Sequence, residues 1–128
     1  MTVDRSVVDG WLAELKAAWE ACDPDRATKL FEHTIEFYER PFEPVTTVDD
    51  YRRLWQQVVG LEDVCFTYEI VAINGATACV HFECTFSRPS RSQRVHLDGV
   101  LLLEFDQAGH CSIYRQWWFM RDAVVPAG

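Results

Sequence analysis

An imidazole and a carboxylate lie two residues apart, at His81 and Glu83, in one of the long β-rich runs of the second half of the chain. Side chains two apart on a strand project from the same face, so these two groups are expected to be neighbours. Inside an apolar cavity such a pair can transfer protons, because burial and pairing shift both pKa values toward neutrality. We predict that His81 and Glu83 are catalytic. The alternative is a solvated pair at a rim or on an outward polar face.

The residues that face this pair follow from the turn that joins the two strands. Asn74-Gly75 is a strong hairpin signal, because both central residues of a type I′ turn need positive φ. A two-residue loop at this place sets Tyr68 opposite His81 and Phe66 opposite Glu83. We therefore predict that Phe66 and Tyr68 contact a ligand on the same face as the catalytic pair.

A second predicted hairpin supplies further walls of the cavity. A four-residue turn from Asp106 to Gly109 sets up three cross-strand pairs: Leu101 with Tyr114, Gly99 with Gln116, and Leu97 with Trp118. The missing side chain of Gly99 is expected to leave room opposite Gln116. The predicted ligand contacts on this hairpin are Leu101, Tyr114, Gln116 and Trp118.

Two residues of an earlier strand complete the predicted site. Tyr38 is expected to form another wall, and Arg40 is expected at the mouth, where it would neutralise an anionic group. The alternative is that the aromatic residues belong to the core and that Arg40 is a solvated loop residue. No cofactor or metal ion is expected, because the four histidines are scattered and no metal-binding spacing is present.

The elements that must position these residues follow from hydrophobic periodicity and breaker residues. Apolar residues recur at steps of three and four from Val8 to Cys22, which predicts a helix. Asp23-Pro24 predicts the start of a second helix that ends near His33. A strand at residues 34–39, a helix that begins with a capping box at Thr47 and reaches Gly60, and four strands from Glu62 onward follow.

This order, α-α-β-α-β-β-β-β, predicts one α+β domain over residues 1–128, with a curved antiparallel sheet packed on helices. Apolar residues fall on both faces of the predicted hairpins, so both faces are expected to be covered. Helices cover one face. A homodimer formed through the convex face of the sheet would cover the other.

Composition narrows the possible partners. The chain is 48% hydrophobic and 13% aromatic, which predicts a packed core, and its net charge of −8 repels nucleic acid. No segment approaches the roughly 18 apolar residues that span a membrane, and no signal peptide is recognisable. Five cysteines without a C-x-x-C pair indicate reduced thiols in a cytoplasmic protein. Neither nucleic acid nor a membrane is therefore expected as a partner, and the predicted cavity is expected to bind a small apolar molecule.

Several short motifs resemble one superfamily. They are Glu39-Arg40-Pro41-Phe42 after the first strand, Leu97-Asp98-Gly99, and the run from Phe105 to Gly109 that leads into Tyr114-Arg115-Gln116. Together with the element order they resemble the nuclear transport factor 2-like superfamily, in particular its SnoaL-like branch of polyketide cyclases, ketosteroid isomerases and limonene epoxide hydrolase. The resemblance implies a cone-shaped α+β barrel of cystatin-like topology that encloses a ligand pocket.

The resemblance leaves two functions open. One is a cofactor-independent acid–base enzyme, such as an isomerase, cyclase, hydratase or hydrolase, acting on a small apolar substrate. The other is a non-catalytic small-molecule binder or a dimeric accessory domain. Ketosteroid isomerases carry their aspartate base where this chain has Arg40, and their two oxyanion donors fall near Leu15 and Leu101, so steroid isomerisation is not expected.

Limonene epoxide hydrolase shares more of the pattern. The Trp-Arg-Asp of that enzyme corresponds to Tyr114-Arg115-Gln116, and its Arg-x-Asp corresponds to His81-x-Glu83 within one residue. Gln116 cannot exchange a proton at neutral pH, but it can orient a ligand or a water molecule.

Overall fold

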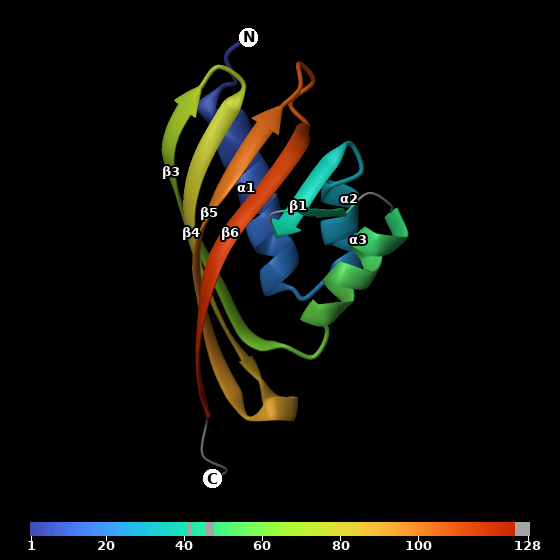
Figure 1. Ribbon diagram of the computed structural model, residues 1–128, viewed down its shortest axis with the longest axis vertical. Helices are drawn as coiled ribbons and strands as arrows, with labels where there is room; N and C mark the ends of the chain where they lie inside the picture. Colours follow the sequence, from blue (N-terminus) through green and yellow to red (C-terminus); the bar gives the residue numbers. More distant parts are fainter. Residues whose placement is uncertain (41, 46–47, 125–128) are drawn as a thin grey trace.

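The computed structural model describes the backbone of residues 1–40, 42–45 and 48–124, and the side chains of residues 1–38, 42, 49–50 and 52–122 (Figure 1). A long, curved sheet lies on one side of the molecule and the helices lie against its concave face. The helices are α1 (Arg5–Glu20), α2 (Pro24–Leu30) and α3 (Val48–Trp55), with 3-10 turns η1 (Gln56–Val58) and η2 (Pro89–Arg91). The strands are β1 (Glu36–Arg40), β2 (Glu43–Val45), β3 (Glu62–Asn74), β4 (Thr77–Arg88), β5 (Gln93–Phe105) and β6 (Cys111–Val124).

The helices follow from the residues that predict them. The core-facing side of α1 is an apolar stripe in which Val8, Leu12 and Leu15 are fully buried. Asp23 caps α2, since its Oδ1 accepts a hydrogen bond of 3.1 Å from the backbone N–H of Arg26. Two predicted ends are too late: α2 stops at Leu30, and α3 stops at Trp55 before a 3-10 turn. The capping residue expected at Thr47 lies outside the described residues.

The sheet confirms the predicted α+β class and adds detail to it. Its strand order is β2-β1-β6-β5-β4-β3. All neighbouring strands are antiparallel except β1 and β6, which run parallel, so the sheet is mixed. The sheet also stays open, with β3 at one edge, and does not close into a barrel.

The β5–β6 hairpin keeps the predicted faces in a shifted register. Leu97 pairs with Met120, Gly99 with Trp118, and Leu101 with Gln116. The shift arises because the loop is longer than predicted and because Ser112 is an extra residue on β6. Phe105 pairs with Cys111, and Glu104 pairs with Ile113. A shift of two residues leaves every side chain on its original face. Leu101, Tyr114, Gln116 and Trp118 therefore share the concave face, as predicted.

The β3–β4 hairpin differs from the prediction in a way that changes faces. Its two turn residues are Gly75 and Ala76, and only Gly75 has positive φ, as the first central position of a type II′ turn requires. Asn74 pairs with Thr77, a shift of two that keeps the faces. Val71 is then an extra residue on β3, because Ala72 pairs with Cys79 and Ile70 pairs with Val80.

This bulge at Val71 overturns the predicted pairing of the candidate catalytic residues. Tyr68 pairs with Phe82 and Phe66 with Cys84, while His81 and Glu83 pair with Glu69 and Thr67. His81 and Glu83 therefore lie on the convex face, opposite to Phe66 and Tyr68. The expectation that all four share one face is wrong, because a single added residue inverts the parity between two strands.

Gly99 is required by close packing and not by an open space. A Cβ atom at this position would lie 2.1 Å from the carbonyl oxygen of Trp117 and 2.9 Å from Cε1 of Phe82. Phe82 is buried and stacks on Phe66, with ring centroids 5.7 Å apart. The room predicted beside Gly99 is thus filled by the core, which contains the apolar side chains of α1 and of the concave face.

The outer edge of β3 is held by two side chains of α1. Lys16 Nζ donates a hydrogen bond of 2.6 Å to the carbonyl oxygen of Phe66, and the N–H of Phe66 donates one of 3.0 Å to Glu20 Oε2. Lys16 and Glu20 also pair with each other at 2.7 Å. Partial burial raises the pKa of Glu20, but the hydrogen bonds from Lys16 and from Phe66 lower it more, so the pKa lies below its usual value.

Candidate functional site

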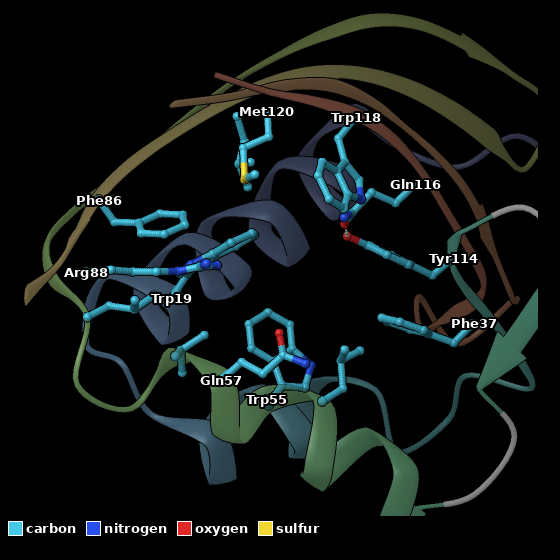
Figure 2. A pocket seen from close by; sticks show the side chains of 14 residues that line it. Trp19, Phe37, Trp55, Gln57, Phe86, Arg88, Tyr114, Gln116, Trp118 and Met120 are labelled. Carbon is cyan, nitrogen blue, oxygen red and sulfur yellow. Dashed lines mark hydrogen bonds between the residues drawn. The ribbon is translucent and has the colours of Figure 1, made fainter. Parts of the chain in front are cut away.

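A pocket of about 290 Å³ lies between the concave face of the sheet and the segment formed by α3 and η1 (Figure 2). This volume is near the lower end of the range for small-molecule sites. Apolar and aromatic side chains form most of its wall, and no Asp, Glu or His is among the described residues that line it. The lining residues are Trp19, Phe37, Leu54, Trp55, Gln57, Val58, Leu61, Phe86, Arg88, Leu97, Tyr114, Gln116, Trp118 and Met120.

One polar pair stands in this apolar wall. The hydroxyl of Tyr114 donates a hydrogen bond of 2.5 Å to Oε1 of Gln116, as the dashed line in Figure 2 shows. Both residues are buried, and they are two apart on β6, so they project together from the concave face. No described residue accepts a hydrogen bond from the amide nitrogen of Gln116. Since the hydroxyl polarises the amide, this N–H group is a strengthened donor within the pocket.

The part of the wall formed by Trp19, Trp55 and Phe37 offers ring surface to a ligand. Trp19 and Trp55 pack edge to face with centroids 5.6 Å apart, and Phe37 stacks on Tyr114 at 4.6 Å. The indole nitrogens of Trp19 and Trp55 are enclosed by protein, and neither has an acceptor in the part of the chain that the structure describes. A ligand therefore meets the carbon surface of these indoles, which favours an apolar or aromatic guest.

Arg88 supplies the one formal charge among the described lining residues. Its guanidinium carbon lies 5.5 Å from the centroid of the Phe86 ring, which also lines the pocket. Figure 2 shows that Arg88 enters the pocket from the side opposite Tyr114 and Gln116. The pocket therefore has a neutral donor at one side and a cation at the other, with aromatic rings between them.

The structure brings three of the predicted site residues together and separates the others. Tyr114, Gln116 and Trp118 line the pocket. Phe66 and Leu101 lie on the concave face but are fully buried in the core and do not reach the pocket. Tyr68 is nearer the edge, where its hydroxyl donates to Asp9 Oδ1 at 2.9 Å. Burial and this contact raise its pKa.

Tyr38 is also displaced from its predicted position. It pairs with Arg115 across β1 and β6, and the guanidinium carbon of Arg115 lies 5.0 Å from its ring centroid. Tyr38 therefore faces away from the pocket, whereas its neighbour Phe37 faces into it. The side chain of Arg40 lies outside the described residues.

The predicted catalytic pair belongs to a polar network on the convex face. His81 Nε2 lies 2.9 Å from Asp98 Oδ1, and His96 Nε2 lies 3.0 Å from Glu83 Oε1. Arg121 extends the network, since its Nη2 lies 3.3 Å from His96 Nδ1. His81 and Glu83 thus contact other partners and do not reach the pocket.

Sequence reasoning missed six of the polar and aromatic lining residues: Trp19, Phe37, Trp55, Gln57, Phe86 and Arg88. The helical spacing of Trp19 and Trp55 predicts core positions, and both rings do pack in or against the core. Phe86 and Arg88 follow Phe82 and Cys84 at steps of two along β4. The apolar run at Val80, Phe82, Cys84 and Phe86 was the available signal for the correct face.

The described part of the chain contains no group of three or more His, Cys, Asp or Glu side chains arranged to hold a metal ion. It also contains no helix that is long and apolar enough to cross a membrane.

Comparison with known families identifies the fold that carries this pocket. The family described as the SnoaL-like domain matches residues 12–113. The chain belongs to this family. The resemblance to the SnoaL-like branch of the nuclear transport factor 2-like superfamily is thereby confirmed. No curated protein matches the sequence.

Several solved structures are similar to most of the chain. An LEH-like epoxide hydrolase from M. tuberculosis superposes with a TM-score of 0.64 at 16% identity, over 89% of this chain and 84% of the other. SalBIII, described as an epoxide hydrolase/cyclase-like enzyme in pyran ring formation, superposes with a TM-score of 0.71 at 16% identity, over 91% of this chain and 93% of the other. TsrD from Streptomyces laurentii superposes with a TM-score of 0.68 at 16% identity, over 92% of this chain and 90% of the other. At this identity the likeness concerns the fold.

Proposed function

We propose that this SnoaL-like protein binds a small, mainly apolar molecule in the pocket and fixes one oxygen atom of that molecule at Gln116. The observation that carries the proposal is the bond from Tyr114 to Gln116, which occupies the amide oxygen and turns the amide N–H toward a ligand. In an otherwise apolar pocket this donor selects guests that carry a carbonyl, ether or hydroxyl oxygen.

Two probes of nearly equal shape test this proposal. Methyl naphthyl ketone carries one acceptor oxygen, and ethylnaphthalene carries none. Equilibrium dialysis is expected to show that the protein prefers the ketone by about five- to tenfold, as one neutral hydrogen bond of about 1 kcal/mol provides. Gln116→Met is expected to abolish this preference while the hydrocarbon still binds.

Gln56→Met is the matched control, because Gln56 is exposed on η1 and does not line the pocket. It is expected to leave both affinities unchanged. If neither probe binds the unmodified protein, the pocket does not act as a binding site for such molecules. If both bind equally, Gln116 has no selecting role.

A second candidate is cofactor-independent catalysis in the same pocket. It is supported by the likeness to solved proteins described as an epoxide hydrolase and an epoxide hydrolase/cyclase-like enzyme. Since no carboxylate or imidazole lines the described pocket, catalysis would rest on the amide N–H of Gln116, which Tyr114 polarises through its hydrogen bond to the amide oxygen. This N–H can stabilise the epoxide oxygen as it gains negative charge, while a water molecule attacks the ring carbon and supplies the proton.

Turnover of styrene oxide, followed by chiral gas chromatography, separates the two candidates. A catalyst is expected to form diol above the buffer rate, and Tyr114→Phe is expected to reduce that rate by about 10- to 1000-fold. Loss of rate with intact ketone binding would assign Tyr114 to the chemistry. Diol formation at the buffer rate, with intact ketone binding, would leave binding as the function.

We further propose that the protein is a cytoplasmic homodimer joined through the convex face of the sheet. Trp117 and Phe119 are 43% and 88% exposed on that face, and Val100 is exposed opposite Trp117. Adjacent exposed apolar side chains of this kind mark interfaces. Light scattering at micromolar concentration is expected to give twice the monomer mass, and Phe119→Glu is expected to give the monomer. A monomeric mass for the unmodified protein would contradict the dimer.

A further inference from the structure

Arg88 lies where two hollows meet. The apolar pocket described above opens beside a second, more polar hollow of about 440 Å³, which is lined by Gly60, Ser90 and Arg91 among others. Gln57, Leu61 and Arg88 line both hollows. A molecule that fills the apolar pocket and extends into the polar hollow therefore passes Arg88, and a polar end in that direction lies beside this guanidinium.

The charge of Arg88 has no acidic counterpart in the described protein. No described carboxylate lies within 4.0 Å of its guanidinium nitrogens, and the same holds for Arg91. Among the described basic side chains, Lys16, Arg26, Arg52 and Arg53 have acidic partners. Arg88 belongs to those that have none, and it also lines the apolar pocket. The two arginines thus place positive charge at the polar hollow beside the pocket, while the protein as a whole is negative.

The setting of Arg88 favours a planar anion. Its side chain is partly buried, and Phe86 supports the guanidinium group from one side. A guanidinium group that is held in this way and partly desolvated binds a carboxylate more strongly than one in open water, and it can do so with two parallel hydrogen bonds.

We propose that the ligand of this pocket is an apolar carboxylic acid, bound with its hydrocarbon part among Trp19, Trp55 and Trp118 and its carboxylate at Arg88. This inference rests on the proposed binding function and adds the chemical class of the ligand to it. Arg91 adds positive potential at the carboxylate end and is not required for contact. An oxygen at the far end of the molecule would lie at Gln116, across the pocket from Arg88.

A pair of probes that differ only in charge tests the inference. Naphthylacetic acid and naphthylacetamide have the same ring system and nearly the same shape, and isothermal titration calorimetry at about pH 7.5 measures their affinities. The unmodified protein is expected to bind the acid at least about tenfold more tightly than the amide. Added salt is expected to weaken binding of the acid more than binding of the amide.

Variants assign the difference to Arg88. Arg88→Met keeps an apolar stem without the charge. It is expected to lower the affinity for the acid to that for the amide and to leave the affinity for the amide nearly unchanged. Arg88→Lys is expected to restore part of the preference, since it keeps the charge without the two-pronged geometry. Arg52→Met removes the same charge from an exposed position on α3 outside both hollows and is expected to change neither affinity.

The outcomes separate this inference from the function on which it rests. Equal affinities of acid and amide for the unmodified protein would overturn the carboxylate assignment and leave small-molecule binding intact. A preference for the acid that survives in Arg88→Met would also overturn it. If neither naphthyl compound binds, and the ketone and the hydrocarbon do not bind either, the binding function fails and the inference fails with it.

Discussion

The two faces of the same four long strands carry different chemistry. On the convex face, His81 pairs with Asp98, and Glu83 pairs with His96, at about hydrogen-bond distance and in contact with solvent. On the concave face, the polar pair of Tyr114 and Gln116 is neutral and buried among aromatic rings. These four ionisable groups thus pair with one another on the convex face. The pocket instead contains the amide donor of Gln116, which can orient a ligand, and the guanidinium group of Arg88.

The largest expected contrast between the faces is in packing. Phe82→Ala removes a ring that is 1% exposed and is expected to lower the free energy of unfolding by about 3–5 kcal/mol. Phe119→Ala removes a ring that is 88% exposed and is expected to change the free energy of unfolding of the folded monomer by less than about 0.5 kcal/mol. Urea titrations at two protein concentrations measure both values and separate any contribution from a dimer. Similar losses would contradict the assignment of the faces.

Thiol reactivity gives the next contrast. Cys84 is buried on the concave face, and burial raises its pKa to about 12, so only about one thiol in 10⁴ is ionised at about pH 8. Cys65 is exposed on the edge strand β3. Iodoacetamide is expected to modify Cys65 at least about 100-fold faster than Cys84, as mass spectrometry of the peptides would show. Rapid labelling of Cys84 in the folded protein would mean that the concave face is open to solvent there.

The smallest expected effect is on the convex face. Glu83→Gln removes the charge that faces His96, and exposed pairs of this kind contribute about 0–1 kcal/mol. The free energy of unfolding, measured by thermal unfolding, is therefore expected to fall by no more than about 1 kcal/mol. The affinity for methyl naphthyl ketone is expected to stay the same. A clear loss of ketone affinity would show that the two faces are coupled and would return Glu83 to the functional site.

Much of the fold could be predicted from the sequence, because its signals are local. The apolar stripe of α1, the cap at Asp23 and the β-rich runs all depend on neighbours within a few residues. The α+β class and the concave position of Tyr114, Gln116 and Trp118 followed correctly. The predicted register of the β5–β6 hairpin was wrong by two residues. The predicted faces were still correct, because side chains two residues apart on a strand lie on the same face.

The site could be predicted only in part, because it depends on parity over longer distances. The extra residue Val71 has no distinctive sequence signal, yet it determines whether His81 or Phe82 lies on the same face as Tyr68. The turn at Gly75 was similarly ambiguous, since both Asn74-Gly75 and Gly75-Ala76 satisfy a two-residue loop. Arg88 was missed for the same reason, because its face follows from the register of β4.

The contacts that Lys16 and Glu20 make with Phe66 have a consequence for the protein at high concentration. An unpaired strand at the end of an open sheet can recruit a strand from another molecule and so start aggregation. Here the N–H and carbonyl groups of Phe66 on the edge strand β3 already form hydrogen bonds with side chains of the same chain. Replacing both residues by alanine is therefore expected to speed aggregation in a concentrated solution, even where the melting temperature falls only slightly.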